Sequence, residues 1–342
     1  MKAQNRTPLH EVLPLPAPYL VQIFPSYACN FKCSFCLYAL PKKEHGYISN
    51  KTLMDFELYK GVIDDMAAAG WRLKMLRFAA IGEPLLHPQI ADMVAYAVEK
   101  QIADTVDIVT NASLLTQALS DKLITAGLSN LRVSLEGLSA KDYKENCGAE
   151  LDFEQLKANL RYYYEHCGNS RVYVKIIDYM LHNDAAREKM FYDSFEPISH
   201  SIAVEHLTPT IEGIDYDKIA EGAELSLTQD GNALRNVSIC PQPFYMIQLN
   251  PDGNLVPCCS MRYPVVFENV AETGIVRAWN SDLQNEFRIN MLGGVKTVSE
   301  VCAKCSLYQY GIHDSDIIDG HEKKLIDRFK SLGQISSDHS KG

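Results

Sequence analysis

Residues 20–36 read LVQIFPSYACNFKCSFC, a short apolar run followed by three cysteines spaced C-x3-C-x2-C. The apolar run Leu20–Phe24 predicts a buried strand, and the cysteines fall in the loop that follows it. Three thiolates on one short loop, Cys29, Cys33 and Cys36, can bind three irons of a [4Fe-4S] cube and leave the fourth iron open to a ligand that is not protein. An open iron indicates chemistry on a bound molecule rather than simple electron storage.

Zinc and disulfides are the other roles open to these thiols. A zinc site needs a fourth ligand, and the only local candidate, His45, lies nine residues beyond Cys36, which is looser than the usual zinc spacing. Disulfides belong to oxidising compartments, whereas the chain opens Met1-Lys2-Ala3-Gln4 with no apolar signal segment. We therefore expect reduced thiols in a cytoplasmic protein.

Length and composition indicate a large soluble enzyme. The chain has 342 residues, 46% of them hydrophobic, and no apolar stretch near the ~20 residues of a membrane helix. Its formal net charge is −10, and the only basic clusters are Lys42-Lys43 and Lys323-Lys324. This charge disfavours a nucleic-acid partner, and the hydropathy predicts no membrane segment.

Short β-branched runs alternate with longer segments of helical period, which is typical of βα units on a parallel sheet. About six such units predict an α/β fold, a partial (βα)6 TIM-like barrel, with its chemistry at the carboxyl ends of the strands. The expected strands are Leu20–Phe24, Leu73–Phe78, Val106–Thr110, Leu131–Leu135, Val172–Tyr179 and Ile202–His206, and the expected helices are Thr52–Ala69, Gln89–Glu99, Thr116–Ala126, Phe153–His166 and Asp184–Ser194.

Glycine and polar residues follow the second, third and fourth expected strands, where a cofactor held at a barrel rim would need them. Turn chemistry alone would also place such residues at strand ends. Their order after the cysteines favours a shared site. The candidates are Gly82 and Glu83 after the second strand, Asn111 after the third, and Ser134 and Glu136 at the end of the fourth.

Together these segments resemble the radical S-adenosylmethionine (SAM) enzymes. The cysteine spacing, with Phe35 before the third cysteine, is similar to the family's cluster motif. The other segments are similar to its Gly-Gly-Glu-Pro, Thr-Asn-Gly and Ser-hydrophobic-acidic-Gly motifs, although Ile81 replaces the first glycine of Gly-Gly-Glu-Pro. They are Ala80-Ile81-Gly82-Glu83-Pro84, Thr110-Asn111-Ala112 and Ser134-Leu135-Glu136-Gly137.

The resemblance implies a cofactor and a role for each candidate. A [4Fe-4S] cluster on the three cysteines would bind SAM and cleave it to methionine and a 5′-deoxyadenosyl radical. Phe35 would lie beside the adenine, Gly82 and Glu83 would receive the SAM ammonium, and Asn111, Ser134 and Glu136 would meet the ribose or the methionine end.

A second group of cysteines begins near residue 235. Cys240 and Cys258 bracket a Pro-Asp-Gly turn between two expected strands, Met246–Leu249 and Asn254–Val256, which brings the two sulfurs together. Cys302 and Cys305 form a C-x2-C pair, so four thiolates could hold a second [4Fe-4S] cluster or a structural zinc.

This region resembles the SPASM and twitch modules of radical SAM enzymes, including the spacing C-x12-G-x4-C from Cys240 through Gly253 to Cys258. No cysteine follows Cys305, so the resemblance implies one auxiliary cluster, in the twitch style. Spacing alone leaves Cys259 open as a ligand in place of Cys258, although the Gly-x4-Cys match favours Cys258.

Three further residues are catalytic candidates. Cys147 could return a hydrogen atom to a substrate radical, as in radical SAM epimerases, or could be a small buried hydrophobe. Glu205 and His206 come at the end of the sixth expected strand, where they could contact substrate or act as a general base.

These observations predict four segments: a lead-in over 1–17, the barrel over 18–234, the SPASM/twitch-like module over 235–315, and a C-terminal helix with a tail disordered from Ser336 over 316–342. The resemblance implies two-electron oxidation of a small polar metabolite, sugar or aminocyclitol-like, with the auxiliary cluster as electron acceptor and a flavodoxin or ferredoxin as reductant. Epimerisation, maturation of a ribosomal peptide, and a non-enzymatic iron-sulfur or zinc scaffold are the alternatives.

Overall fold

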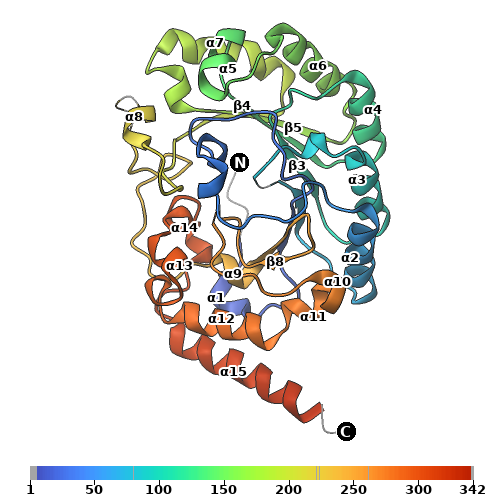
Figure 1. Cartoon of the computed structure of the whole chain (residues 1–342), viewed down its shortest axis with the longest axis vertical. Coiled ribbons are helices and arrows are strands. Elements are labelled where there is room, and N and C mark those ends of the chain that lie inside the picture. Colours follow the sequence, from blue (N-terminus) through green and yellow to red (C-terminus); the bar gives the residue numbers. More distant parts are fainter. Residues whose placement is uncertain (1–5, 80, 221, 223, 261, 340–342) are drawn as a thin grey trace.

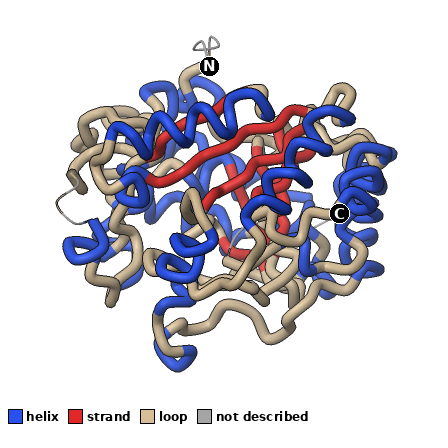
Figure 2. Tube along the Cα trace, turned by 90° about the horizontal axis from the view of Figure 1, so that it is seen from above, coloured by secondary structure: helices blue, strands red, loops and turns tan. Residues whose placement is uncertain are grey.

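Eight strands form one sheet in the order β6-β5-β4-β3-β2-β1-β7-β8 (Figures 1 and 2). The computed structural model describes residues 6–79, 81–220, 222, 224–260 and 262–339. Every pair from β6 to β7 is parallel, and only β8 runs antiparallel. The strands are β1 Leu20–Ile23, β2 Met75–Phe78, β3 Val106–Thr110, β4 Asn130–Leu135, β5 Arg171–Ile177, β6 Ser201–Glu205, β7 Met246–Leu249 and β8 Leu255–Val256.

The sheet is open, with β6 and β8 as its two edges, which confirms the predicted α/β fold and partial barrel. Helices α2 to α7 lie on the outer side of the curved sheet (Figure 1). They are α2 Phe56–Ala68, α3 Ile90–Glu99, α4 Gln117–Thr125, α5 Ala140–Cys147, α6 Phe153–His166 and α7 Ala185–Phe195.

Strand β7 comes from the second cysteine region and joins the barrel. It pairs in parallel with β1, Leu20 opposite Met246 and Ile23 opposite Leu249, although more than 200 residues separate them. The predicted turn at Asp252-Gly253 then returns the chain as β8, with the Gly253 N–H donating to the Asn250 carbonyl at 3.0 Å. The second cysteine region is therefore built onto the barrel sheet.

Local capping explains where the helices begin. The helix predicted from Thr52 starts at Phe56, because the Asp55 side chain accepts the Leu58 N–H at 3.0 Å. Thr116 and Asp152 cap α4 and α6 in the same way. The prediction missed α5, which is short and is capped by Ser139 at its start and by Gly148 in a left-handed conformation at its end.

The core lies between the sheet and these helices. Tyr59 of α2 is fully buried, contacts Phe78 of β2 with ring centroids 5.9 Å apart, and donates its hydroxyl to the Met93 carbonyl of α3 at 2.7 Å. In α6 the buried residues recur at helical spacing, as the sequence pattern requires. They are Phe153, Leu156, Leu160 and Tyr163.

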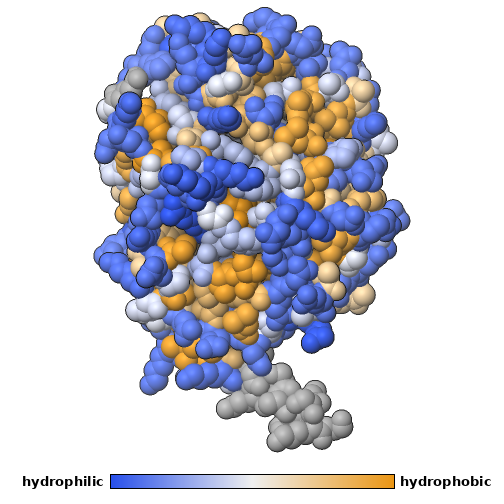
Figure 3. Space-filling view, viewed as in Figure 1, coloured by the Kyte–Doolittle hydropathy of each residue, from blue (hydrophilic) through white to orange (hydrophobic). Residues whose placement is uncertain are grey.

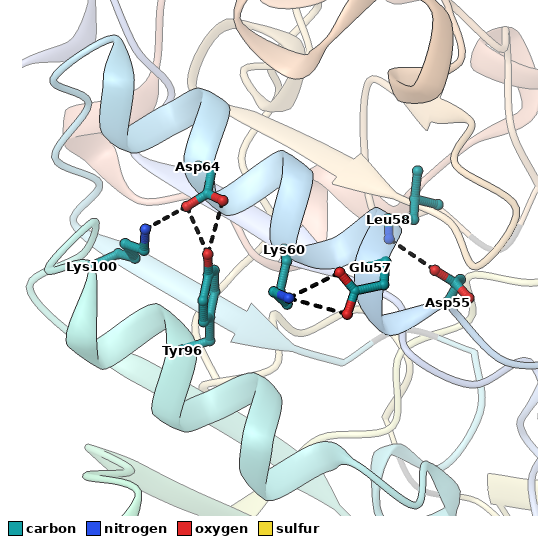
Figure 4. A network of polar contacts seen from close by, with 7 residues as sticks. All are labelled: Asp55, Glu57, Leu58, Lys60, Asp64, Tyr96 and Lys100. Atoms are coloured by element: carbon teal, nitrogen blue, oxygen red, sulfur yellow. Dashed lines mark hydrogen bonds and ion pairs between the residues drawn. The ribbon is translucent and has the colours of Figure 1, made fainter.

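Polar contacts join α2 and α3 on the outer surface (Figure 4). Asp64 of α2 forms an ion pair with Lys100 at 2.6 Å and accepts a hydrogen bond from the Tyr96 hydroxyl at 2.8 Å. Lys60 forms an ion pair with Glu57 within α2. Exposed pairs of this kind contribute about 0–1 kcal/mol each, so they fix the orientation of the two helices more than their stability.

The remaining helices belong to the chain ends and the C-terminal third. Helix α15 runs through Ser336 to His339, so the predicted disorder from Ser336 was wrong as far as His339; residues 340–342 lie outside the described residues. Within the described residues, no helix has the length and apolar character needed to span a bilayer. These helices are α1 Leu9–Val12, α8 Tyr216–Ala220, α9 Gln242–Tyr245, α10 Val270–Thr273, α11 Ile275–Trp279, α12 Asp282–Leu292, α13 Glu300–Lys304, α14 Leu307–Tyr310 and α15 Glu322–His339.

Candidate active site and metal centres

The cysteine loop leaves the carboxyl end of β1, and backbone hydrogen bonds join it to two other segments. The Ala28 carbonyl accepts the Glu83 N–H at 2.9 Å, and the N–H groups of Lys32 and Ser34 donate to the carbonyls at the end of α5, those of Cys147 and Asn146, at 2.9 and 3.0 Å. Cys29, Cys33 and Cys36 are all partly buried. The loop is thus positioned by the neighbouring strand ends, as expected for a metal centre at a barrel rim.

The three thiols lie in an environment that disfavours their charged form. Burial raises the pKa of Cys29 to about 12. A hydrogen bond with Cys147 and burial raise the pKa of Cys33, and burial raises that of Cys36. A metal centre on these sulfurs must therefore displace their protons, which is how thiolate ligation couples to pH.

Glu83 is buried and directs its carboxylate to strand β3. Its oxygens accept the Thr110 hydroxyl at 2.6 Å, the Asn111 N–H at 2.8 Å and the Leu85 N–H at 2.9 Å. Burial raises the pKa of Glu83 to about 6 against these three donors. The contact predicted between Glu83 and the SAM ammonium stays a prediction.

Gly82 allows the segment after β2 to pack against the segment before Cys29. Its φ is +137°, and an added Cβ would lie 2.0 Å from the Ser26 carbonyl oxygen. We expect Gly82→Ala to lower the free energy of unfolding by about 3 kcal/mol and deoxyadenosine formation at least tenfold, since the segment before Cys29 must move. Gly70→Ala is the matched control: its φ is +69° and no atom lies within 4 Å, so only about 1 kcal/mol of backbone strain is added. Urea unfolding that shows equal losses for the two variants would contradict this expectation.

Asn111 connects β3 to the cysteine loop. Its amide donates to the Asn30 side chain at 3.1 Å, and its carbonyl oxygen accepts the Ser113 N–H at 3.0 Å. Asn111 is buried, so a ribose contact by its side chain would replace one of these bonds. Its assignment to SAM stays a prediction.

Ala112 has a φ of +57°, at the position where the similar family motif has glycine. A left-handed conformation costs a residue with a Cβ about 1–2 kcal/mol. We expect Ala112→Gly to raise the free energy of unfolding by up to about 1 kcal/mol, measured by urea denaturation. Ala95→Gly, at an exposed position inside α3, should lose about 1 kcal/mol instead, and a loss in both variants would count against strain at Ala112.

Glu136 follows β4 and faces the cysteine loop. Burial raises the pKa of Glu136 to about 7, opposed by a hydrogen bond with Cys33 and by the charge of Lys175. Its Oε2 is buried without a hydrogen-bond partner in the described part of the chain. Ser134 is half-buried and lies opposite Lys175 in the β4–β5 register. The structure thus brings Glu136 to the cysteine loop, whereas Ser134 lies further inside the barrel.

Phe35 packs edge-on against Tyr179, which follows β5, with ring centroids 6.3 Å apart. Its backbone carbonyl accepts the Tyr216 hydroxyl at 3.1 Å. Helix α8 therefore reaches the residue before the third cysteine, and the adenine contact of Phe35 stays a prediction.

Cys147 ends α5 directly beneath the cysteine loop. Only 1% of it is exposed, and its thiol donates to the Tyr143 carbonyl at 2.9 Å. This placement beside Cys33 favours the buried, structural reading of Cys147 over a hydrogen-atom donor that must meet substrate.

Glu205 and His206 lie together at the end of β6 but differ in their partners. Glu205 accepts hydrogen bonds from the Tyr173 hydroxyl at 2.8 Å, from the Lys175 ammonium at 2.5 Å and from the Gln229 side-chain amide. Burial alone would raise the pKa of Glu205, but these donors outweigh it and lower the pKa, so Glu205 is held ionised. His206 pairs through Nδ1 with Asp178 at 2.8 Å and is the more available base.

Four cysteines of the second region line one mainly apolar cavity. They are Cys240, Cys258, Cys302 and Cys305. Cys259 is absent from this lining; its thiol lies 3.6 Å from the Gln242 side-chain oxygen and close to Arg77. An all-thiol, apolar enclosure fits an iron-sulfur cluster, and the placement favours Cys258 over Cys259 as the ligand. Among the described residues, however, no three Cys, His, Asp or Glu side chains are close enough to hold a single metal ion.

Strand direction separates the two cysteine groups. The first follows the carboxyl end of β1, whereas Cys240 precedes β7 and Cys258 follows the antiparallel β8, near the amino ends of the same strands. On the face seen in Figure 3, hydrophilic residues predominate and hydrophobic residues form separate patches between them.

Two family models match the chain. The Radical SAM superfamily matches residues 23–191, and an iron-sulfur cluster-binding domain, SPASM, matches residues 240–306. The chain belongs to the radical SAM superfamily. This confirms the resemblance seen in the sequence and, with it, the expected cofactors: SAM with its [4Fe-4S] cluster, and an auxiliary cluster.

Two curated relatives are similar to this radical SAM protein over part of their length. GTP 3',8-cyclase from Chlorobaculum tepidum is 36% identical over 36% of the chain and 34% of its own length. The dTDP-4-amino-4,6-dideoxy-D-glucose ammonia-lyase from Streptomyces venezuelae is 28% identical over 42% of the chain and 28% of its own length. The matched region thus spans about a third of these relatives.

Solved structures share the fold at lower identity. BtrN in complex with AdoMet and 2-DOIA has a TM-score of 0.52 at 18% identity, over 84% of this chain and 92% of its own. Streptococcus suis SuiB bound to precursor peptide SuiA has a TM-score of 0.58 at 16% identity, over 88% and 72%.

Sequence reasoning missed the polar side chains inside the barrel of this radical SAM protein. Arg77, Arg132 and Lys175 interrupt otherwise apolar strands, and this alternation was the signal that could have revealed them. A polar residue within a buried parallel strand points to the interior of a barrel rather than to its helices.

Proposed function

We propose that this chain is a radical SAM oxidoreductase that removes two electrons and two protons from a small polar metabolite, sugar or aminocyclitol-like. The placement of the two cysteine groups at opposite ends of the strands carries this proposal, because a substrate inside the barrel would lie between them. When bound, the two clusters and SAM supply a 5′-deoxyadenosyl radical that abstracts hydrogen from a C–H bond, and an acceptor for the electron then released.

The chain's own residues would hold and orient the reactants. Cys29, Cys33 and Cys36 would ligate the first cluster, and Cys240, Cys258, Cys302 and Cys305 the auxiliary one. The Gly82-Glu83 backbone, Phe35, Asn111, Ser134 and Glu136 would contact SAM.

A proton must also leave the oxidised carbon or its hydroxyl. His206 is the proposed acceptor, because Asp178 fixes its Nδ1 and leaves Nε2 to receive the proton. Glu205 would serve as a charged substrate contact, since its donors hold it ionised.

The small polar substrate is supported by the matched relatives, which act on GTP and on a dTDP-linked amino sugar. Two alternatives remain as proposals. Epimerisation would need a hydrogen donor such as Cys147, whose burial argues against it, and peptide maturation would follow SuiB, which shares only the fold. We also propose a cytoplasmic location, a flavodoxin or ferredoxin reductant, and domain limits at 17, 234 and 315.

Anaerobic reconstitution tests the proposal. Iron and sulfide are counted, and 5′-deoxyadenosine is measured by chromatography after SAM and dithionite are added. About eight irons per chain with deoxyadenosine are expected. Four irons with deoxyadenosine would overturn oxidation through an auxiliary cluster, and zinc without deoxyadenosine would overturn the enzyme itself.

Candidate sugars and aminocyclitols are then screened in D2O. Oxidation yields a product two mass units lighter for each deoxyadenosine formed. Recovery of substrate carrying one solvent deuterium would instead identify an epimerase and overturn the oxidation.

A further inference from the structure

The strands present a polar face to the inside of the barrel. The strand residues that face the helices are apolar; Phe78, for example, packs against Tyr59. The alternate residues of each strand point to the opposite face of the sheet, the inside of the barrel. Parallel register keeps this second set on one face across neighbouring strands. The barrel interior set comprises Gln22, Arg77, Asp107, Asn130, Arg132, Ser134, Tyr173, Lys175, Glu205 and Gln248.

Most of this set is paired within the barrel. Lys175 meets Glu205 at 2.5 Å, and Gln22 donates to Gln248 at 2.7 Å. Asp107 is fully buried and accepts Asn130 at 2.6 Å. These contacts satisfy Glu205 but leave the Asp107 Oδ2 buried without a hydrogen-bond partner among the described residues.

Arg77 is incompletely satisfied. Its Nη2 is 3.6 Å from the Asp107 Oδ2, longer than a hydrogen bond, and its Nε is buried with no partner in the described part of the chain. The strand register places Arg77 of β2 and Arg132 of β4 on the same face of the sheet, on either side of β3. Burial and the charge of Arg132 lower the pKa of Arg77.

Arg132 lies against an aromatic ring instead of a carboxylate. Its guanidinium lies 4.7 Å from the centre of the Tyr173 ring, and it forms no ion pair with any residue that the structure describes. Tyr173 is itself held by Glu205, so the ring is a fixed platform for the guanidinium. The guanidinium of Arg132 is thus held at an aromatic ring, with no ion pair to a described residue.

We propose that Arg132, with Arg77, binds an anionic group of the substrate, phosphoryl or carboxylate, inside the barrel. The inference rests on the proposed function, which places substrate there, and it adds the substrate's chemical class. Guanidinium donors match either anion in a two-point contact. The interior set has three cationic side chains, Arg77, Arg132 and Lys175, against two carboxylates, Asp107 and Glu205. This excess of positive charge, in a chain whose net charge is −10, would favour an anion there.

The test uses inorganic pyrophosphate and malonate as probes of the two anion classes. Each is titrated by anaerobic calorimetry into the reconstituted full chain with SAM. We expect one of them to bind, and Arg132→Gln to weaken that binding at least tenfold. Arg132→Lys keeps the charge but loses the planar guanidinium, so its affinity for the anion should lie between those of the wild type and Arg132→Gln. Arg161→Gln, an exposed change on α6, should bind like the wild type.

Preferential binding of pyrophosphate would identify a phosphoryl group, and preferential binding of malonate a carboxylate. Binding of neither probe, or equal binding by the wild type and both Arg132 variants, would overturn the proposal. Iron content and circular dichroism of each variant establish that it is folded. Because calorimetry needs no turnover, a chain that binds anion but forms no deoxyadenosine would overturn the proposed reaction and leave this site standing.

Discussion

Replacing Cys33 with serine should reduce 5′-deoxyadenosine formation to the level seen without protein, a loss of at least a thousandfold. The cysteine loop has three thiols for three irons, so one missing ligand removes a corner of the cube. Iron content should fall from about eight to about four per chain, since the second cysteine group is at the other end of the strands. Cys29→Ser and Cys36→Ser should behave in the same way.

Cys167→Ser is the matched control for the cysteine loop. Cys167 is buried just after α6, and its thiol donates to the Tyr164 carbonyl at 3.1 Å. Its replacement should leave iron content and deoxyadenosine unchanged. A Cys33→Ser protein that keeps eight irons and full deoxyadenosine formation would show that the first cluster is held elsewhere.

Cys258→Ser and Cys259→Ser should differ strongly in iron content and in substrate oxidation, although the two residues are adjacent. Cys258 lines the cavity shared with Cys240, Cys302 and Cys305, so its loss should remove about four irons. Deoxyadenosine should still form, because the first cluster remains, but substrate oxidation should fall at least a hundredfold without an acceptor for the second electron.

Cys259→Ser should keep about eight irons, because the Cys259 thiol faces Gln242 rather than the cavity. Iron counting and Mössbauer spectroscopy distinguish the two variants before any substrate is known. The reverse pattern, with iron lost only from Cys259→Ser, would assign the fourth ligand to Cys259.

The sequence predicted the strands of the barrel well because each is an apolar, β-branched run bounded by turn residues. Val106–Thr110 and Met246–Leu249 match β3 and β7 to the residue. The strand ends were also informative: Glu83, Asn111 and Glu136, chosen by their positions after strands and by their similarity to family motifs, all contact the cysteine loop or its supports in the structure.

Contacts between distant segments could not be predicted in this way. Nothing local in Met246–Leu249 specifies pairing with Leu20–Ile23, because parallel pairing is decided by the whole sheet. The hydrogen bond from the Thr110 hydroxyl to Glu83 likewise depends on the pairing of β2 with β3. Arg132 was overlooked because the candidate residues were chosen at strand ends, whereas Arg132 lies inside β4, where only the alternation of polar and apolar residues indicates its face.

The pairing of β7 with β1 also sets the order of events during synthesis. Strand β1 leaves the ribosome early, but its second neighbour begins at Met246, more than 200 residues later. At 5–20 residues per second, one edge of β1 waits roughly 10 to 50 s for its partner. During this interval the nascent barrel exposes an unpaired strand edge, and a fragment that stops before Met246 keeps it permanently. The last third of the chain therefore completes the first strand, and shortened forms should aggregate rather than fold as a smaller barrel.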